Sequence, residues 1–247
     1  EIPGFNFGYA DKYDNIFYIS NGIIPVRNAK YNWRGVVPGN TRETLWTDYH
    51  STEDLPQVLN PESGFLYNAN NTPFKSTSEN ENPNSEDFPK EMGYSTYDNN
   101  RSTRILELIE SHDRIDFSDF KSIKFDYKFP TPFNFNFVDV NQIMEMNPDD
   151  YPEISELIKE IQNWDRSTNS DSLGAGVFAM FYYNLGNYIG KSYINRKLSK
   201  DLIALILKDV KSYMIKYFKK TKVKLGDYQK LVRGKKEIPI WGMPDVI

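Results

Sequence analysis

The chain has 247 residues and a net charge of −4, from 30 Lys and Arg against 34 Asp and Glu, which argues against a protein that mainly neutralises nucleic-acid phosphates. It contains no cysteine and only two histidines, which excludes disulfides, thiolate nucleophiles and metal centres rich in either residue. No apolar run reaches the roughly 18–20 residues of a membrane-spanning helix, so no membrane span is expected.

The N-terminal part is predicted to contain a β-hairpin. Two β-rich runs, residues 15–20 and 23–27, flank Asn21 and Gly22. An Asn-Gly pair favours the tight type I′ turn because both residues tolerate positive φ. Pro25 has no backbone N–H, so it is expected at an edge or at the end of the second strand.

The segments that follow lack a helical period. Residues 32–74 are rich in Gly, Pro, Asn and aromatic residues, which indicates ordered loops and short strands with specific turns. Residues 75–90 are polar and contain many turn-forming residues, which favours an exposed, mobile loop.

Helical periodicity begins near residue 100. Ile105, Leu108 and Ile109 lie on one helical face, and Ser118 is predicted to cap a short helix. Residues 133–137 alternate Phe with Asn as a half-buried strand does, although prolines flank this short run.

Three longer helices and a strand-like end complete the chain. Helices are expected over residues 154–161, 173–189 and 202–217. Gly174 and Gly176 suggest that the helix at 173–189 packs closely on a neighbour. The basic run at 216–224 is typical of a solvated helix end.

The order of the elements indicates an α+β fold. We expect one domain made of three segments. These are a β-hairpin and active-site loop segment at 1–115, a helical segment at 116–225 and a return strand segment at 226–247.

Common catalytic arrangements find little support in the residues alone. Serine–histidine catalysis would need His50 or His112, and neither lies near a Gly-x-Ser-x-Gly sequence. The adjacent acids at 86–87 and 149–150 could serve glycoside hydrolysis, but adjacent carboxylates usually face solvent, and that interpretation is favoured.

A series of short motifs runs along nearly the whole chain, and its order and spacing are more specific than any single member. The series resembles the penicillin acylases (penicillin amidases), N-terminal-nucleophile amide hydrolases, and especially their aculeacin and acyl-homoserine-lactone acylase branch. The motifs are Asn15-Ile-Phe-Tyr, Pro25-Val-Arg27, Gly35-Val-Val-Pro-Gly39, Glu43-Thr-Leu-Trp46, Pro56-Gln57, Asn60-Pro61, Ser63-Gly64, Asn68-Ala-Asn-Asn71, Asn100-Arg101, Asn163-Trp164-Asp165, Arg233-Gly234 and Gly242-Met-Pro-Asp245.

The resemblance implies an αββα architecture and a self-cleaving precursor whose second chain begins with a nucleophilic Ser. By the same resemblance, Asn70 helps to form the oxyanion hole and Arg101 organises the active site and the substrate. A neutral amide donor suits an oxyanion because it carries no charge to desolvate. The alternatives are that Asn68, Asn70 and Asn71 only satisfy turn backbone groups, and that Arg101 is an exposed cation at a helix start.

The expected nucleophile is missing from this sequence. A Ser that uses its own α-amine as base must be the first residue, and residue 1 is Glu. We therefore expect an interior fragment of the nucleophile-bearing β chain that is inactive alone. Its expected partners are the α chain, the rest of the β chain and an N-acylated small molecule, with no nucleic acid.

Further expectations come from the resemblance alone. No cofactor is evident, but calcium is possible in the intact enzyme, and the acidic loop 79–87 is a plausible neighbourhood for a ligand. Export, for example to the periplasm, is expected. Phe65, Tyr67 and Phe74 flank Asn70 and could line an acyl pocket, although core packing suits most of them better.

Two other hypotheses remain open. The chain could be a non-enzymatic module that binds a glycan or peptide through Tyr, Trp and Asn side chains. It could also belong to a degenerate family member that has kept only an interaction role.

Overall fold

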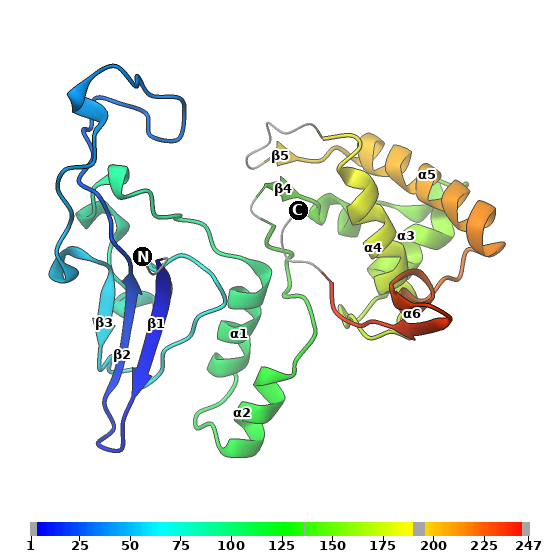
Figure 1. The fold of residues 1–247 in the computed structure, drawn as a ribbon. Helices are drawn as coiled ribbons and strands as arrows, with labels where there is room; N and C mark the ends of the chain where they lie inside the picture. Colours follow the sequence, from blue (N-terminus) through cyan, green and yellow to red (C-terminus); the bar gives the residue numbers. More distant parts are fainter. Residues whose placement is uncertain (1–3, 136, 190–195, 244–247) are drawn as a thin grey trace. The chain divides into compact units, whose positions relative to one another are not determined.

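The computed structural model describes residues 4–135, 137–189 and 196–243. The chain divides into two compact units, Glu1–Asp98 and Asn99–Ile247 (Figure 1). The segment boundaries expected near residues 115 and 225 stay predictions. Asp245 of the last motif and the end of the third segment lie outside the described residues. None of the described helices is both long and apolar enough to cross a membrane.

The N-terminal unit contains a three-stranded antiparallel sheet of order β1-β2-β3. The strands are β1 (Phe5–Ala10), β2 (Ile16–Asn21) and β3 (Gln57–Leu59). In register, Phe7 pairs with Ile19 across β1 and β2, and Tyr18 pairs with Val58 across β2 and β3. Alternation along β2 therefore presents Ile19 to a small core.

The predicted hairpin at Asn21-Gly22 is wrong. Strand β2 pairs instead with the preceding strand β1, across a turn that the Asp11 side chain stabilises. Its carboxylate accepts hydrogen bonds from the backbone N–H of Tyr13 and of Asn15, at 2.8 and 3.0 Å. Asp14 adopts the positive φ of 64° that this turn requires.

The chain beyond β2 does not form the expected second strand. It makes an isolated antiparallel bridge between Pro25 and Tyr49. The core of this unit is small and consists of Ile19, Leu55 and Met92 with partly buried aromatic neighbours. Loops therefore make up most of the N-terminal unit.

The segment 75–90 is more ordered than the sequence suggested. It contains the 3₁₀ turns η3 (Glu79–Glu81) and η4 (Ser85–Asp87), followed by η5 (Lys90–Met92). Ser76 and Thr77 at its start are buried. The Asn82 side chain binds the backbone of residues 76–78, whereas Glu79, Asn80, Glu86 and Asp87 are exposed, as the sequence suggested.

The C-terminal unit begins with two helices. Helix α1 (Asn100–Glu110) is where periodicity placed it, and helix α2 (Phe117–Lys124) follows. The predicted cap Ser118 is wrong, because the Asp116 side chain accepts from the N–H of Asp119 at 2.9 Å and caps α2.

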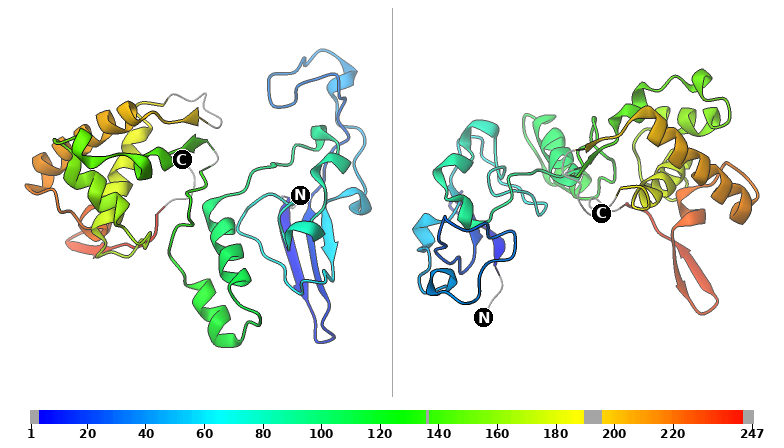
Figure 2. Two further views of the ribbon diagram at one scale, coloured as in Figure 1. Left: turned by 180° about the vertical axis from the view of Figure 1, so that it is seen from behind. Right: turned by 90° about the horizontal axis from the view of Figure 1, so that it is seen from above.

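The remaining predicted helices are confirmed in position. They are α3 (Ser155–Gln162), α4 (Leu173–Leu185) and α5 (Lys200–Phe218), with a short α6 (Leu225–Tyr228). Their buried apolar side chains belong to one core, and α4 packs against α3, α5 and α6. Figure 2 shows these helices from two further sides. A Cβ at Gly176 would lie 2.1 Å from the carbonyl oxygen of Val223, which explains the small residues of α4.

Short strands complete this unit. Strand β4 (Val138–Asp139) pairs in parallel with β5 (Arg196–Lys197), and β6 (Lys230–Arg233) forms a hairpin with β7 (Lys236–Pro239). The expected strand at 133–137 is not formed over its described residues. Phe133 and Phe135 are buried in the aromatic core instead, where the Phe133 ring stacks on Phe178 at 4.7 Å, whereas Phe137 is exposed.

Candidate active-site loop

The segment that carries Asn70 follows strand β3 and is fixed at its first residue. Asn60 adopts a φ of 49°. Its side-chain oxygen accepts from the N–H of Ile16 at 2.8 Å, and its amide nitrogen donates to the Asn15 side chain at 2.9 Å. These contacts fasten the start of the loop to the first residues of β2.

Hydrogen bonds also join the two arms of the loop. The Tyr67 N–H donates to the Ser76 carbonyl at 2.9 Å, and the Thr77 hydroxyl donates to the Phe65 carbonyl at 2.8 Å. Asn82 accepts from the N–H groups of Ser76 and Thr77. The loop between the arms is thus held as a defined unit.

Two asparagine side chains shape the tip of the loop. The Asn68 side-chain oxygen accepts from the Asn70 N–H at 3.0 Å, and that of Asn71 accepts from the Ala69 N–H at 2.8 Å. Asn71 also donates to the carbonyl of Lys75. Asn68 and Asn71 therefore satisfy turn backbone groups, as the alternative interpretation expected for the whole cluster.

Asn70 occupies a distinct position at this tip. Its φ is 59°, a left-handed conformation that Asn tolerates better than most residues. Ala69 and Asn71 on either side are buried, whereas Asn70 is exposed. The tip is further tied to β1 through Asn6, which donates to Asn68 at 3.1 Å. The loop thus presents the residue at position 70 on a backbone that its neighbours hold in place.

Arg101 lies near the start of helix α1 in the C-terminal unit. The helix is capped by Asn99, whose side chain accepts from the Ser102 N–H at 2.9 Å, while the Ser102 hydroxyl accepts from the Asn99 N–H at 3.2 Å. Arg101 itself is exposed. The two candidate residues belong to different units, so their common site stays a prediction.

The sequence matches the model of the family described as Penicillin amidase over residues 1–235. The chain belongs to this family. A curated relative, penicillin G acylase from Escherichia coli, is 40% identical over 70 residues, which are 28% of this chain and 8% of the relative. The aculeacin branch that the motifs suggested stays a prediction.

A solved structure of the penicillin amidase family shows the same fold. The thermostable penicillin G acylase from Alcaligenes faecalis superposes with a TM-score of 0.56 at 14% identity, over 86% of this chain and 46% of the other. The α+β class and its place among N-terminal-nucleophile hydrolase folds are thereby confirmed. The chain spans less than half the length of this relative.

The other candidate groups of this penicillin amidase family member have local structural roles. The ring of His112 lies 2.8 Å from the Leu108 carbonyl at the end of α1. The His50 N–H donates to the Ile24 carbonyl, and its ring lies 3.9 Å from the Asp54 carboxylate. The acid pairs at 86–87 and 149–150 are exposed in short 3₁₀ turns.

One carboxylate of the acidic loop 79–87 binds the backbone of a neighbouring turn. The Glu81 carboxylate accepts from the backbone N–H groups of Glu62 and Ser63. Across the described residues, no group of three or more acidic or histidine side chains is arranged to hold a metal ion.

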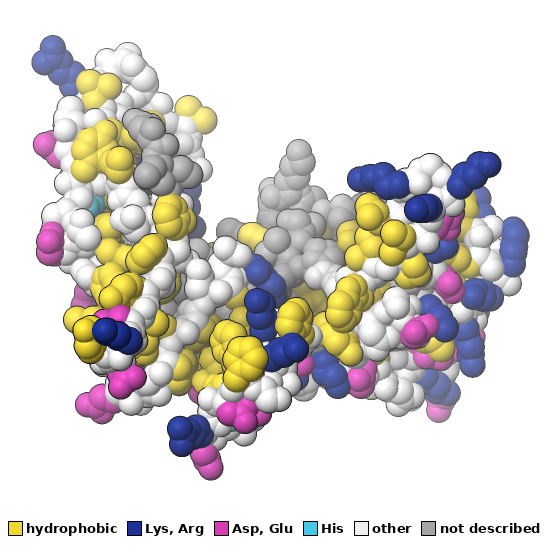
Figure 3. Space-filling view, turned by 60° about the horizontal axis from the view of Figure 1, so that its bottom comes forward, with side chains coloured by type: hydrophobic (Ala, Val, Ile, Leu, Met, Phe, Trp, Pro, Cys, Tyr) yellow, Lys and Arg dark blue, Asp and Glu magenta, His cyan; other side chains and the backbone are white. Residues whose placement is uncertain are grey.

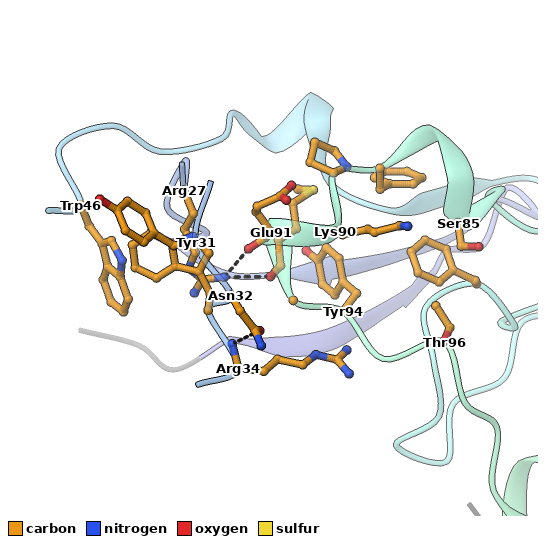
Figure 4. Close-up of a pocket in the computed structure, with 16 residues that line it drawn as sticks. Arg27, Tyr31, Asn32, Arg34, Trp46, Ser85, Lys90, Glu91, Tyr94 and Thr96 are labelled. Carbon is orange, nitrogen blue, oxygen red and sulfur yellow. Dashed lines mark hydrogen bonds between the residues drawn. The ribbon is translucent and has the colours of Figure 1, made fainter. Parts of the chain in front are cut away.

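The aromatic residues beside Asn70 lie in two places. Tyr67 is buried, and its ring stacks on Phe65 at 6.3 Å, which agrees with a packing role. Phe74 instead lines a cleft of about 820 Å³ within the N-terminal unit (Figure 4). Sequence analysis missed this cleft, although the Pro25-Val-Arg27 and Glu43-Thr-Leu-Trp46 motifs contribute residues to it.

Proposed function

We propose that the whole protein hydrolyses the amide bond of N-acylated small molecules of the β-lactam, acyl-homoserine-lactone or lipopeptide type. Membership of the penicillin amidase family supports amide hydrolysis of acylated substrates. The finer choice among these substrates depends on the shape of the acyl pocket.

The proposed reaction divides its roles between this chain and polypeptide outside it. The Ser hydroxyl at the start of the processed chain attacks the amide carbon, and its own α-amine takes the proton. The C–N bond then breaks, the amine leaves with that proton, and water releases the acid. Asn70 donates its side-chain N–H to the oxyanion, and Arg101 orients the substrate.

The geometry of the loop at 65–77 is the observation that carries this proposal. An oxyanion donor is effective when it is already in place before charge develops, because reorganisation then costs nothing during the reaction. Asn68 and Asn71 hold the backbone on both sides of Asn70 through side-chain hydrogen bonds. Position 70 is thus exposed between two buried neighbours on a backbone that is fixed on both sides.

Partners and location follow the same proposal. The α chain and the remaining part of the β chain would complete the active site, so residues 1–247 alone should lack activity. We infer export to the periplasm, and cell fractionation of the source organism checks this. A cytoplasmic protein would contradict it.

The test uses the whole protein and an N-acylated substrate. Asn70→Ala should lower kcat by about 10²–10³-fold, equivalent to roughly 2.7–4 kcal/mol of transition-state stabilisation. Asn80→Ala is the matched control, because Asn80 is an exposed asparagine in the same unit. Undiminished turnover by Asn70→Ala would remove Asn70 from the mechanism. A wild-type protein that binds acylated compounds without cleaving them would favour the binding-module or degenerate-enzyme hypotheses.

A further inference from the structure

The cleft in the N-terminal unit is lined by sixteen residues, of which six are aromatic. It is formed by residues between 27 and 96, so it belongs to this unit alone. Its volume of about 820 Å³ falls within the roughly 300–1,000 Å³ of small-molecule pockets. The aromatic residues that line it are Tyr31, Trp33, Trp46, Phe74, Phe88 and Tyr94.

Arg27 is fixed at one end of this cleft (Figure 4). Its Nη1 donates to the carbonyl oxygens of Glu91 and Met92, at 2.5 and 3.3 Å. The guanidinium carbon lies 5.2 Å from the ring centre of Trp46 and 5.9 Å from that of Trp33. The side chain is therefore held by neutral groups only.

The charge of Arg27 is not neutralised within the part of the chain that the structure describes. No carboxylate there lies within ion-pair distance of it, and its Nε is buried without a hydrogen-bond partner. Arg34 and Lys90 also line the cleft, whereas Glu91 is the one acidic residue in the lining. A half-buried cation without a counter-charge favours an anion.

The opposite wall supplies the apolar contacts. The Phe74 ring lies 5.4 Å from that of Phe88 and 6.2 Å from that of Tyr94. Burial raises the pKa of the Tyr94 hydroxyl, which donates to the Ser20 carbonyl and thus stays neutral and anchored. This wall offers ring faces and edges to a planar ligand and no negative charge to oppose an anion.

We propose that this cleft is a binding site for a small aromatic carboxylate. The carboxylate would pair with the Arg27 guanidinium, and the ring would pack among the aromatic side chains. A guanidinium suits a carboxylate because its charge is permanent and strengthens the hydrogen bonds that it donates. This site does not depend on the proposed hydrolysis, since none of its residues has a role in that reaction.

The test compares two ligands that differ only in charge. Titration calorimetry on the whole protein would use 2-naphthoate and its neutral analogue 2-naphthamide. Wild type should bind the acid more tightly. Arg27→Gln should weaken binding of the acid by about tenfold or more, because it removes one charge-assisted contact. The same variant should hydrolyse an N-acylated substrate as fast as wild type does. Arg42→Gln, an exposed cation of the same unit outside the lining, should bind like wild type.

Two further variants keep the test decisive if Arg27→Gln does not fold. Arg27→Lys should retain the preference for the acid, and Trp46→Ala should weaken binding of both ligands. Equal affinity of the acid and the amide for wild type would overturn the proposal. Equal acid affinity of wild type and either Arg27→Gln or Trp46→Ala would do the same. A protein that binds naphthoate through Arg27 but cleaves no amide would refute the proposed function and leave this site standing.

Discussion

The two compact units are stabilised by different kinds of interaction. The C-terminal unit has a continuous apolar core in which helices α3, α4 and α5 bury their inner faces. The N-terminal unit has a small core around Ile19, Leu55 and Met92, and several of its buried residues are polar, including Asn71 and Thr72. Apolar packing therefore stabilises most of the C-terminal unit, whereas hydrogen bonds from side chains to loop backbone contribute much of the order in the N-terminal unit.

This difference bears on one of the two candidate residues, Asn70, which lies in the loop-rich unit, whereas Arg101 lies on helix α1 of the other. Functional residues are often carried by loops, and loops that are held by specific hydrogen bonds can present a side chain such as Asn70 at a fixed position. Both units expose charged and apolar side chains on the face shown in Figure 3, so surface composition does not separate them. The two units can instead be distinguished by mutations that disturb helix packing in one and loop hydrogen bonds in the other.

The largest effect on stability is expected from packing in the C-terminal unit. Gly176→Ala would place a methyl group 2.1 Å from the carbonyl oxygen of Val223, so the backbone would have to move. We expect a loss of about 2–3 kcal/mol in the free energy of unfolding, measured by urea denaturation of the whole protein. Gly186→Ala is the control, because the nearest atom to its new methyl group, the carbonyl oxygen of Tyr183, would lie at 3.7 Å. Equal stability of the two variants would mean that α4 does not pack as described.

A loop substitution should alter activity as well as stability. Asn71→Ala would remove the side chain that binds the Ala69 N–H and the Lys75 carbonyl, in buried and partly buried hydrogen bonds. We expect a loss of about 1–3 kcal/mol. If Asn70 is the oxyanion donor, kcat should fall more than KM changes, because the donor loses its alignment while substrate contacts remain.

The control for this prediction is again Asn80→Ala, which should leave both stability and kcat near wild type. A variant at Asn71 that loses stability but keeps its full kcat would show that Asn71 supports the fold and does not position Asn70.

A helix cap should have a smaller effect. Asp116→Ala removes the side chain that accepts from the Asp119 N–H at the start of α2, and caps of this type contribute about 1 kcal/mol. Ser118→Ala should have almost no effect, because Ser118 lies inside the helix. The same denaturation experiment measures both, and a larger loss at Ser118 would restore the cap that the sequence suggested.

These cases show which features could be predicted from the sequence. Helices α1, α3, α4 and α5 were found because amphipathic periodicity reports burial directly. The hairpin was misplaced because Asn21-Gly22 suits a turn locally, whereas the pairing was decided by the strand before Asp11. The motif at 68–71 identified the Asn70 loop, but not the hydrogen bonds of Asn71, which depend on backbone positions. The cleft was missed because it brings together residues from 27–46 and 74–96.

The smallest expected effect concerns the turn between β1 and β2. Hydrogen bonds from the Asn15 side chain and backbone lower the pKa of Asp11 below its ordinary value of 3.8. A carboxyl group with a lowered pKa in the folded state stabilises that state above its unfolded pKa, and the contribution is lost as pH falls through the folded pKa. Stability of wild type should therefore fall below about pH 4 more steeply than that of Asp11→Asn. Parallel pH profiles of the two proteins, measured by urea denaturation, would show that Asp11 does not stabilise the turn through its charge.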